Sequence, residues 1–400
     1  MNIAVNLTPA ELALGGITLP HARMEDWRWT NLRTLIDKPY PPMGKIAASS
    51  KDVARLRDSS PVAKAVAARL VFVNGEFAAN ESRFPASGDV MVKTGLPVVP
   101  TSDEPVVSMN AAFAKDGLTL SVKPGANIDM PIELVFLATA GDPRTIATCV
   151  AIEIGAGASA TLIETFLGEG SYLASSAVAI SLGEGARLDR ITLERHAPEA
   201  IHLADRDVTL QGRAILRDFT LTAGAKLNRQ NARYTFAGEH ADARIAGAYL
   251  LGDRQHADTR LVVRHAKPHC TSREIFKCVM DDHARGIFQG KVIVDPGAQK
   301  TDGKQSSHAL LLSETAEFDA KPELEIFADD VVCGHGATSG DLDHTQIFYL
   351  RSRGIPERKA KAMLVAAFVE EAFETIGNDQ IRVALSDIAA GWLSSRGGVA

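Results

Sequence analysis

The chain has 400 residues, which is too long for one ordinary compact core and predicts two or three modules or one elongated repeat architecture. Hydrophobic residues make up 46% and charged residues 23%, values that argue against a largely disordered chain. Because the chain carries 43 Lys and Arg against 49 Asp and Glu, the net charge of -6 supplies no general attraction to nucleic acid or anionic membranes.

The chain is rich in Gly, with 32 residues, and poor in aromatic residues, which make up only 6%. A core of small and aliphatic side chains favours thin, regularly stacked layers. Met1–Ala10 lack the pattern of a signal peptide, and no run reaches the roughly 18 apolar residues of a membrane span, so we expect a cytoplasmic protein. The four cysteines are scattered and form no CxxC pair, which predicts neither a disulfide framework nor a closed structural zinc site.

The first 110 residues predict a mixed α/β region. Thr8-Pro9-Ala10-Glu11 is typical of a helix start, because Thr caps a free amide and Glu reaches back, and this helix should run to about Leu14. A further helical pattern extends from Lys51 to about Leu70, with a break at Ser59-Ser60-Pro61. Val71–Phe77 predicts a hairpin around Asn74-Gly75, and Thr94–Pro105 predicts a loop.

From Leu118 to Ile326 the pattern changes to short β-branched runs separated by Gly-containing turns, with no convincing helix. Gly155, Gly183 and Gly212 recur at intervals of 28 and 29 residues, a period compatible with one coil of a β-solenoid. A β-sandwich is the alternative, but it would have to accommodate some 200 uninterrupted β residues and should show cleaner Asn-Gly hairpins.

The end of the chain returns to helix. Pro356 suits a first helical turn and Gly377 suits a C-terminal cap, so a helix is predicted between them. Its apolar stripe could pack against the β region or dock another protein, and both interpretations remain open at this point. The stripe consists of Val365, Phe368, Val369, Ala372, Phe373 and Ile376.

The common enzyme motifs are absent: the sequence has no GxxxxGK[ST] phosphate loop, no GxSxG elbow and no HExxH pair, so we expect this chain to bind no nucleotide. The densest chemical segment is Asp329–Thr338, where Cys333 and His335 would share one face of a strand. A thiolate and an imidazole suit a soft metal such as iron. Two ligands are too few for a stable site, so a partner would have to supply the others; the alternative is a buried Cys beside a hydrogen-bonded His.

Three other groups are weaker candidates. His265, His269 and Cys270, with Cys278 beyond, could form a ligand cluster, although Pro268 breaks any helical arrangement of the two histidines. Asp281-Asp282-His283 could serve acid–base chemistry but is more typical of a polar turn. Glu323 and Glu325 share a strand face and are a candidate carboxylate pair for glycosidic chemistry, although such charges are usually solvated.

Five segments in the second half of the chain carry a specific pattern: Arg285–Lys291, Gln299–Asp302, Lys321–Ile326, Asp330–Thr338 and Ile347–Ile355. Together they resemble the SufB/SufD family of iron–sulfur cluster assembly proteins. Gly334 stands where the family usually has Ser, a change of one small residue for another.

Two features favour the SufD-like branch of this family. Glu25–Thr30 resembles the N-terminal tryptophan motif of that branch, and 400 residues suit it better than the longer SufB chains. Gln305–His308 has no thiol where SufB carries its essential cysteine, so the resemblance implies that this chain cannot by itself accept sulfur as SufB does.

The resemblance implies a right-handed parallel β-helix core at 111–345, flanked by an α/β region at 1–110 and a helical region at 346–400. It implies a non-catalytic scaffold that pairs edge to edge with SufB, binds the ATPase SufC through its C-terminal helices, and shares a transient iron or iron–sulfur cluster with SufB. His335 matches the family's cluster or iron ligand, and Cys333 is either a second ligand or a packing residue. The residues expected at the partner contacts are Phe348, Tyr349, Leu350, Arg351, Arg353, Val365, Phe368, Val369 and Phe373.

Two other functions remain to be distinguished from the scaffold: a β-helix carbohydrate-active enzyme, which predicts a signal peptide and an exposed acidic groove, and a structural homodimer that acts without SufB.

Overall fold

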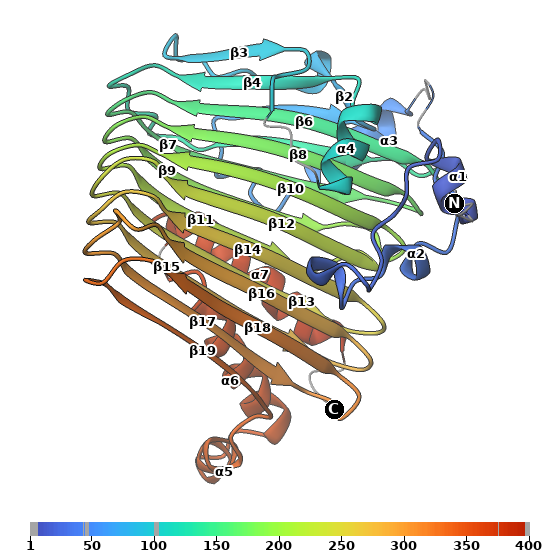
Figure 1. Ribbon diagram of the computed structural model, residues 1–400. Helices are drawn as coiled ribbons and strands as arrows, with labels where there is room; N and C mark the ends of the chain where they lie inside the picture. Colours follow the sequence, from blue (N-terminus) through green and yellow to red (C-terminus); the bar gives the residue numbers. More distant parts are fainter. Residues whose placement is uncertain (1–6, 43, 45–47, 100–103, 375, 397–400) are drawn as a thin grey trace, which may run out of the picture.

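The computed structural model describes residues 7–42, 44, 48–99, 104–374 and 376–396. Two β-sheets face each other, one of ten strands and one of nine, and consecutive strands alternate between them once β4 is reached (Figure 1). From β4 onward each strand pairs in parallel with the strand two places along the chain. This arrangement is a parallel β-solenoid of about 8 turns, and it confirms the predicted fold class.

The ten-stranded sheet contains β1 (Ala68–Val73), β2 (Glu76–Phe77), β5 (Ile132–Ala138), β7 (Ser159–Gly168), β9 (Arg187–Arg195), β11 (Ile215–Thr222), β13 (Asp242–Leu251), β15 (Thr271–Met280), β17 (Asp302–Leu311) and β19 (Val332–Gly340). The nine-stranded sheet contains β3 (Val90–Thr94), β4 (Gly117–Val122), β6 (Thr145–Ile154), β8 (Leu173–Leu182), β10 (Ile201–Leu210), β12 (Leu227–Phe236), β14 (His256–His265), β16 (Arg285–Val294) and β18 (Glu317–Ile326). The helices are α1 (Pro9–Ala13), α2 (Leu32–Leu35), α3 (Ser50–Asp58), α4 (Pro105–Phe113), α5 (His344–Ser352), α6 (Glu357–Glu370) and α7 (Asp379–Ser395), with 3-10 turns at Glu25–Trp27 and Ala79–Glu81.

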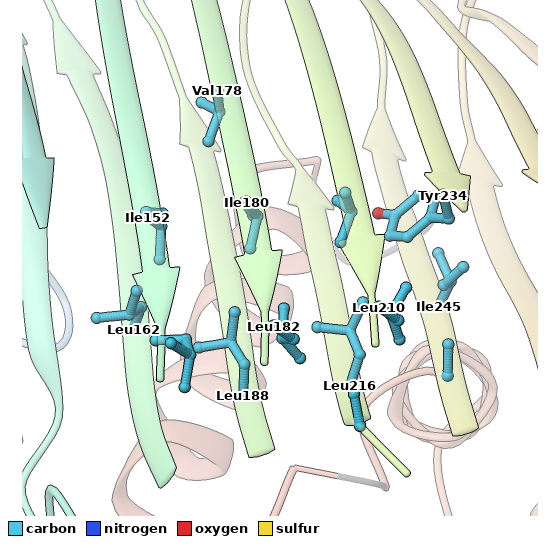
Figure 2. Close-up of a cluster of buried hydrophobic side chains, with 14 of the residues drawn as sticks. Ile152, Leu162, Val178, Ile180, Leu182, Leu188, Leu210, Leu216, Tyr234 and Ile245 are labelled. Atoms are coloured by element: carbon cyan, nitrogen blue, oxygen red, sulfur yellow. The ribbon is translucent and has the colours of Figure 1, made fainter. Parts of the chain in front are cut away.

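The sequence period is the period of the coils. Ile154 of β6 lies beside Leu182 of β8, and Leu182 lies beside Leu210 of β10, so residues 28 positions apart stack on one another. Alternate side chains point into the space between the sheets, where branched residues from both sheets meet (Figure 2). Each fully buried Leu or Ile contributes about 2 kcal/mol of burial free energy, and the stacking repeats this contribution on every coil.

The high Gly content has a physical cause in the turns that connect the coils. A Cβ on Gly183 would lie 2.6 Å from the backbone nitrogen of Ala156 in the preceding coil, so a larger residue would push the turns apart. Two residues later, Gly185 has a φ of 66°, in the left-handed region that favours glycine.

Two outer layers cover the solenoid (Figure 1). The N-terminal segment lies on the nine-stranded sheet, where Trp27 packs with Ile201 and Leu203, and the guanidinium of Arg229 lies 4.5 Å from the Trp27 ring centroid. The C-terminal helices lie on the ten-stranded sheet, where Val365 and Phe373 join one apolar cluster with outward residues of β9 to β15. Within the described residues, no helix is both long enough and apolar enough to cross a bilayer.

The solenoid interior also contains charge. Arg190 forms ion pairs with Glu164 and with Asp218, whose Oδ1 lies 3.0 Å from Arg190 Nη1. Arg206 Nη1 lies 3.0 Å from the other carboxylate oxygen of Asp218, and the hydroxyl of Tyr234 donates to that oxygen over 2.7 Å. Burial alone would raise the pKa of Asp218, but the two guanidinium groups outweigh it and lower that pKa.

Several local predictions are confirmed. Thr8 and Glu11 form the capping box of α1, and β1 and β2 form the hairpin around Asn74 and Gly75, both of which have positive φ. The chain from Leu118 to Ile326 contains strands and turns without a helix.

Two helix predictions are wrong in extent. The helical pattern from Lys51 to about Leu70 breaks at Ser59-Ser60-Pro61 as predicted, since α3 ends at Asp58, but the part after the break is not helix, and Ala68–Val73 pairs in parallel with β5. The helix expected to reach Gly377 ends at Glu370, where the amide groups of Ala372 and Phe373 bond to carbonyls three residues back and tighten the chain into turns. Helix α4 begins at Pro105, where the loop predicted at Thr94–Pro105 ends, and the sequence pattern does not predict it.

Candidate functional site

The solenoid ends in two edge strands. β18 pairs only with β16, and β19 pairs only with β17, so each strand leaves one row of backbone donors and acceptors unpaired within the described part of the chain. Most residues of β19 are exposed, in contrast to the strands of the earlier coils. An unpaired edge of this kind can accept a strand from another protein.

Cys333 and His335 lie on β19, as the sequence predicted that they would share a strand. Cys333 is the cross-strand neighbour of Gly303, and His335 is the neighbour of Gln305. Cys333 is half-buried against the interior apolar cluster, and burial raises the pKa of its thiol above the ordinary value. His335 is exposed. The pair therefore presents an accessible imidazole beside a thiol that burial keeps protonated.

Beneath His335 a polar column runs into the solenoid. Its members are His335 on β19, Gln305 on β17 and Glu274 on β15, which are successive cross-strand neighbours. Glu274 is fully buried, and neither of its carboxyl oxygens has a hydrogen-bond partner among the described residues. Burial raises the pKa of Glu274 from 4.5 to about 7. The open end thus lies above a carboxyl group that is poised to change charge near neutral pH.

The other histidine and cysteine candidates are separated. His265 is buried against the ring of Phe236 and lies 3.0 Å from the hydroxyl of Ser272. The thiol of Cys270 donates to a backbone carbonyl, and Cys278 is buried in a different apolar cluster. His269 stacks on the ring of His240. None of these side chains belongs to a group of three ligands within the described residues.

The acidic candidates are engaged in ion pairs. Glu325 Oε1 lies 2.5 Å from Lys291 Nζ, and Glu323 Oε2 lies 3.1 Å from Lys321 Nζ. Asp282 lies in a turn and pairs with Arg396 near the end of the described chain. These contacts agree with the interpretation of the acidic residues as surface charges.

The residues expected at partner contacts fall into two groups. Phe348 and Tyr349 on α5 are 73% and 54% exposed, and the guanidinium of Arg353 lies 4.5 Å from the Tyr349 ring centroid. Arg351 is also exposed and pairs with Glu357 at 3.0 Å, while Leu350 is half-buried.

The second group faces the solenoid. Val365, Val369 and Phe373 are buried against the ten-stranded sheet. Phe368 is half-buried, with Lys277 Nζ 4.6 Å from its ring centroid. In this chain these side chains therefore hold the helical layer in place.

Sequence reasoning missed a third group, which lies inside the solenoid. Glu194 near the end of β9, His196 in the corner that follows and His202 in β10 are all buried, and one ligand atom of each lies within 4.8 Å of the others. Burial and the neighbouring His202 lower the pKa of His196 to about 4, against the opposing effect of Glu194. Burial alone would raise the pKa of Glu194, but the two histidines lower it. The available signal was the short spacing of Glu194 and His196 at the end of a predicted strand, with His202 following six residues later.

The comparisons with known proteins agree on one family. The family model described as SUF system FeS cluster assembly, SufBD core domain, matches residues 136–368. The iron–sulfur cluster assembly protein SufD of Escherichia coli is 30% identical over 380 residues, which cover 91% of this chain and 87% of that protein.

Two further relatives extend the range of organisms. An iron–sulfur cluster assembly SufBD family protein of Synechocystis is 30% identical over 390 residues, covering 91% of this chain and 85% of its own length. A chloroplastic protein of Arabidopsis thaliana, ABCI7, is 28% identical over 288 residues, covering 69% of this chain and 60% of its own length.

Proposed function

The chain belongs to the SufB/SufD family of iron–sulfur cluster assembly proteins, and on this basis we propose that it is a non-catalytic scaffold subunit that holds iron or a nascent cluster at its open end. The observation that carries the proposal is the position of Cys333 and His335 on β19, an edge strand with one unpaired side. Two ligands from this chain are too few for a stable site, so the others come from the protein that covers the edge.

The partner at the edge is SufB in this proposal, and the shared cluster lies at the boundary between the two β-helices. A shared site suits a scaffold that must release its product, because the ligand set is complete only while the partner is in place. The four cysteines are free, which suits a reducing compartment, and we place the protein in the cytoplasm.

The ATPase partner SufC docks, in this proposal, on the C-terminal helical region at 346–400, while 111–345 forms the β-helix core and 1–110 an N-terminal α/β region. The exposed Phe348 and Tyr349 supply an apolar contact surface. A groove of about 470 Å³ between α6 and α7 is a second apolar contact surface, and Met363, which lines it, is 45% exposed. Nucleotide hydrolysis belongs to SufC, since this sequence contains no phosphate loop.

The ligand assignment is tested with His335→Ala. Because the side chain is exposed, the variant should fold and bind SufB and SufC as the unmodified chain does. The purified complex, reconstituted anaerobically with iron and sulfide, should hold less cluster by its visible absorption and iron content. His283→Ala, which removes an exposed histidine from a turn, is the matched control. Equal cluster yields from the two variants would refute the assignment of His335.

Edge pairing is tested with Ala337→Pro. The amide of Val332 donates to Thr301 of the preceding coil over 2.8 Å, so by strand alternation the amide of Ala337 faces the open edge. Proline there removes a donor from the free edge and leaves the bonds to β17 in place. We expect the variant to co-purify with less SufB, whereas Ala337→Val, which keeps the amide, should not. Undiminished co-purification of the proline variant would exclude pairing through β19.

SufC docking is tested with Met363→Glu, which puts a charge into the apolar groove. We expect less SufC to co-purify with this variant. Val383→Glu is the matched control, because Val383 is 60% exposed on α7 and does not line the groove. Equal retention of SufC by both variants would exclude the groove as the docking surface.

A further inference from the structure

We infer that Glu194, His196 and His202 form a resident binding site for one divalent transition-metal ion inside the solenoid. This site is separate from the open end and does not depend on the proposed scaffold role. Two imidazoles and one carboxylate are a ligand set that suits Zn²⁺ or Fe²⁺. β9, which carries Glu194, and β19, which carries Cys333 and His335, are five strand spacings apart, about 24 Å, so one ion cannot serve both places.

The distances are close to those that a metal requires. One carboxylate oxygen, Oε2 of Glu194, lies 3.1 Å from Nε2 of His196 and 2.6 Å from Nδ1 of His202. A tetrahedral ion with bonds of about 2.1 Å holds its ligand atoms about 3.4 Å apart. Oε2 of Glu194 would therefore need to move less than about 1 Å away from each ring nitrogen, and all three ligand atoms already lie within 4.8 Å of one another.

The second nitrogen of each ring has its own oxygen partner. Nδ1 of His196 lies 3.1 Å from the hydroxyl of Tyr172, and Nε2 of His202 lies 2.8 Å from the hydroxyl of Ser176. Metal-bound histidines usually donate their other N–H to an oxygen in this way, which fixes the tautomer and aims the free lone pair at the ion. With these tautomers, two nitrogen lone pairs and Oε2 of Glu194 converge, and a cation between them removes their mutual repulsion.

The charge balance favours a cation as well. The Glu194 side chain is 2% exposed, and no Lys or Arg in the described residues forms an ion pair with it. Its other hydrogen bonds come from the neutral amides of Asn228, at 2.9 Å, and Gln230, at 3.3 Å. Burying a carboxylate away from Lys and Arg is costly, and a divalent ion held by Glu194 and the two imidazoles supplies positive charge there.

The surroundings hold the rings in place. The ring of Phe166 lies 4.8 Å from that of His202 and 5.3 Å from that of His196, centroid to centroid. A cavity of about 20 Å³ lies beside His196, Tyr172 and Ser176, although Glu194 and His202 do not line it. Since about 10 to 15 Å³ suffices for one water molecule, this cavity has room for one water next to His196.

The experiment measures metal in the isolated chain. The protein is stripped with chelator and offered one equivalent of Zn²⁺ or Co²⁺, both to the native chain and during refolding because the ligands are buried. After gel filtration we expect about one ion per chain, and a Co²⁺ spectrum with visible ligand-field bands but no thiolate charge-transfer band. Metal content at the level of the stripped protein, or a thiolate band, would overturn the inference.

Variants locate the ion. Glu194→Gln keeps the size of the side chain and removes its charge, and we expect it to retain less than a tenth of the metal. Cys333→Ser and His335→Ala are the controls and should retain all of it. Metal lost from the controls but kept by Glu194→Gln would assign the ion to the open end instead. If Glu194→Gln fails to fold, His196→Asn takes its place, and the stoichiometry and Co²⁺ spectrum of the unmodified chain decide the question without any variant.

Discussion

Glu274→Gln tests whether a buried carboxyl under the open end makes the fold sensitive to pH. Glu274 is completely buried on β15, and its carboxyl oxygens lack hydrogen-bond partners among the described residues. Burial raises its pKa from 4.5 to about 7, against the smaller effects of the neighbouring Ser272 hydroxyl and of Arg273. In the unfolded chain the carboxyl ionises near its ordinary value, so between these two pKa values only the unfolded state loses the proton.

The sign and size of the effect follow from this difference. Well below pH 4.5 Glu274 is protonated in both the folded and the unfolded state, so it does not change the free energy of unfolding. As pH rises toward about 7, ionisation stabilises the unfolded state but not the folded state, so the free energy of unfolding falls. The difference between 4.5 and about 7 corresponds to a loss of about 3 kcal/mol in the free energy of unfolding. Above about pH 7 the loss stays constant.

Urea unfolding of the unmodified chain and of Glu274→Gln, at about pH 5 and about pH 8, measures the effect. Gln has the same shape and no charge, so the advantage of the variant should grow by about 3 kcal/mol between these pH values. Glu314→Gln removes an exposed carboxyl from a turn and should change nothing. Identical pH profiles for the Glu274 variant and the unmodified chain would refute the argument.

Three further substitutions test what holds the layers together. Arg190→Met leaves two buried carboxylates without their shared guanidinium and should lower the free energy of unfolding in urea by about 3 to 5 kcal/mol. Arg213→Met breaks only an exposed pair and should lower it by less than about 1 kcal/mol, so equal losses would contradict the interior network. Trp27→Ala removes the buried anchor of the N-terminal segment and should cost about 3 to 5 kcal/mol, with faster limited proteolysis of that segment but not of the C-terminal helices; unchanged cleavage would contradict the anchoring role. Phe373→Ala should cost about 3 to 5 kcal/mol, whereas the exposed Phe348→Ala should cost less than about 1 kcal/mol, and the reverse order would mean that α5 rather than the Phe373 region holds the helical layer.

The repeat could be predicted from the sequence because a solenoid is built from neighbours in the chain. Each coil stacks on the next at a nearly constant interval, so the spacing of Gly155 and Gly183 is itself the register of β6 and β8. The shared strand face of Cys333 and His335 could also be predicted, because side chains two positions apart on a strand point to the same side. The family likewise follows from contiguous segments.

Other features depend on contacts that no local pattern carries. Lys51–Leu70 has a helical pattern on both sides of its break, yet its end became strand because β5, some sixty residues away, offered backbone partners. The stripe of Val365 and Phe373 could have faced solvent, a partner or the sheet, and only the assembled layers bury it against the ten-stranded sheet.

The same distinction applies to the two candidate sites, the Cys333–His335 pair and the group of Glu194, His196 and His202. The sequence by itself determined the stacked β architecture and the Cys333–His335 pair, because both follow from short-range spacing. Only the tertiary structure decided that this pair lies on an open edge above Glu274, and that His202 from one sheet meets Glu194 from the other. The physical reason is that the two sheets face each other across the interior, so residues close in space there come from strands that share no backbone hydrogen bonds.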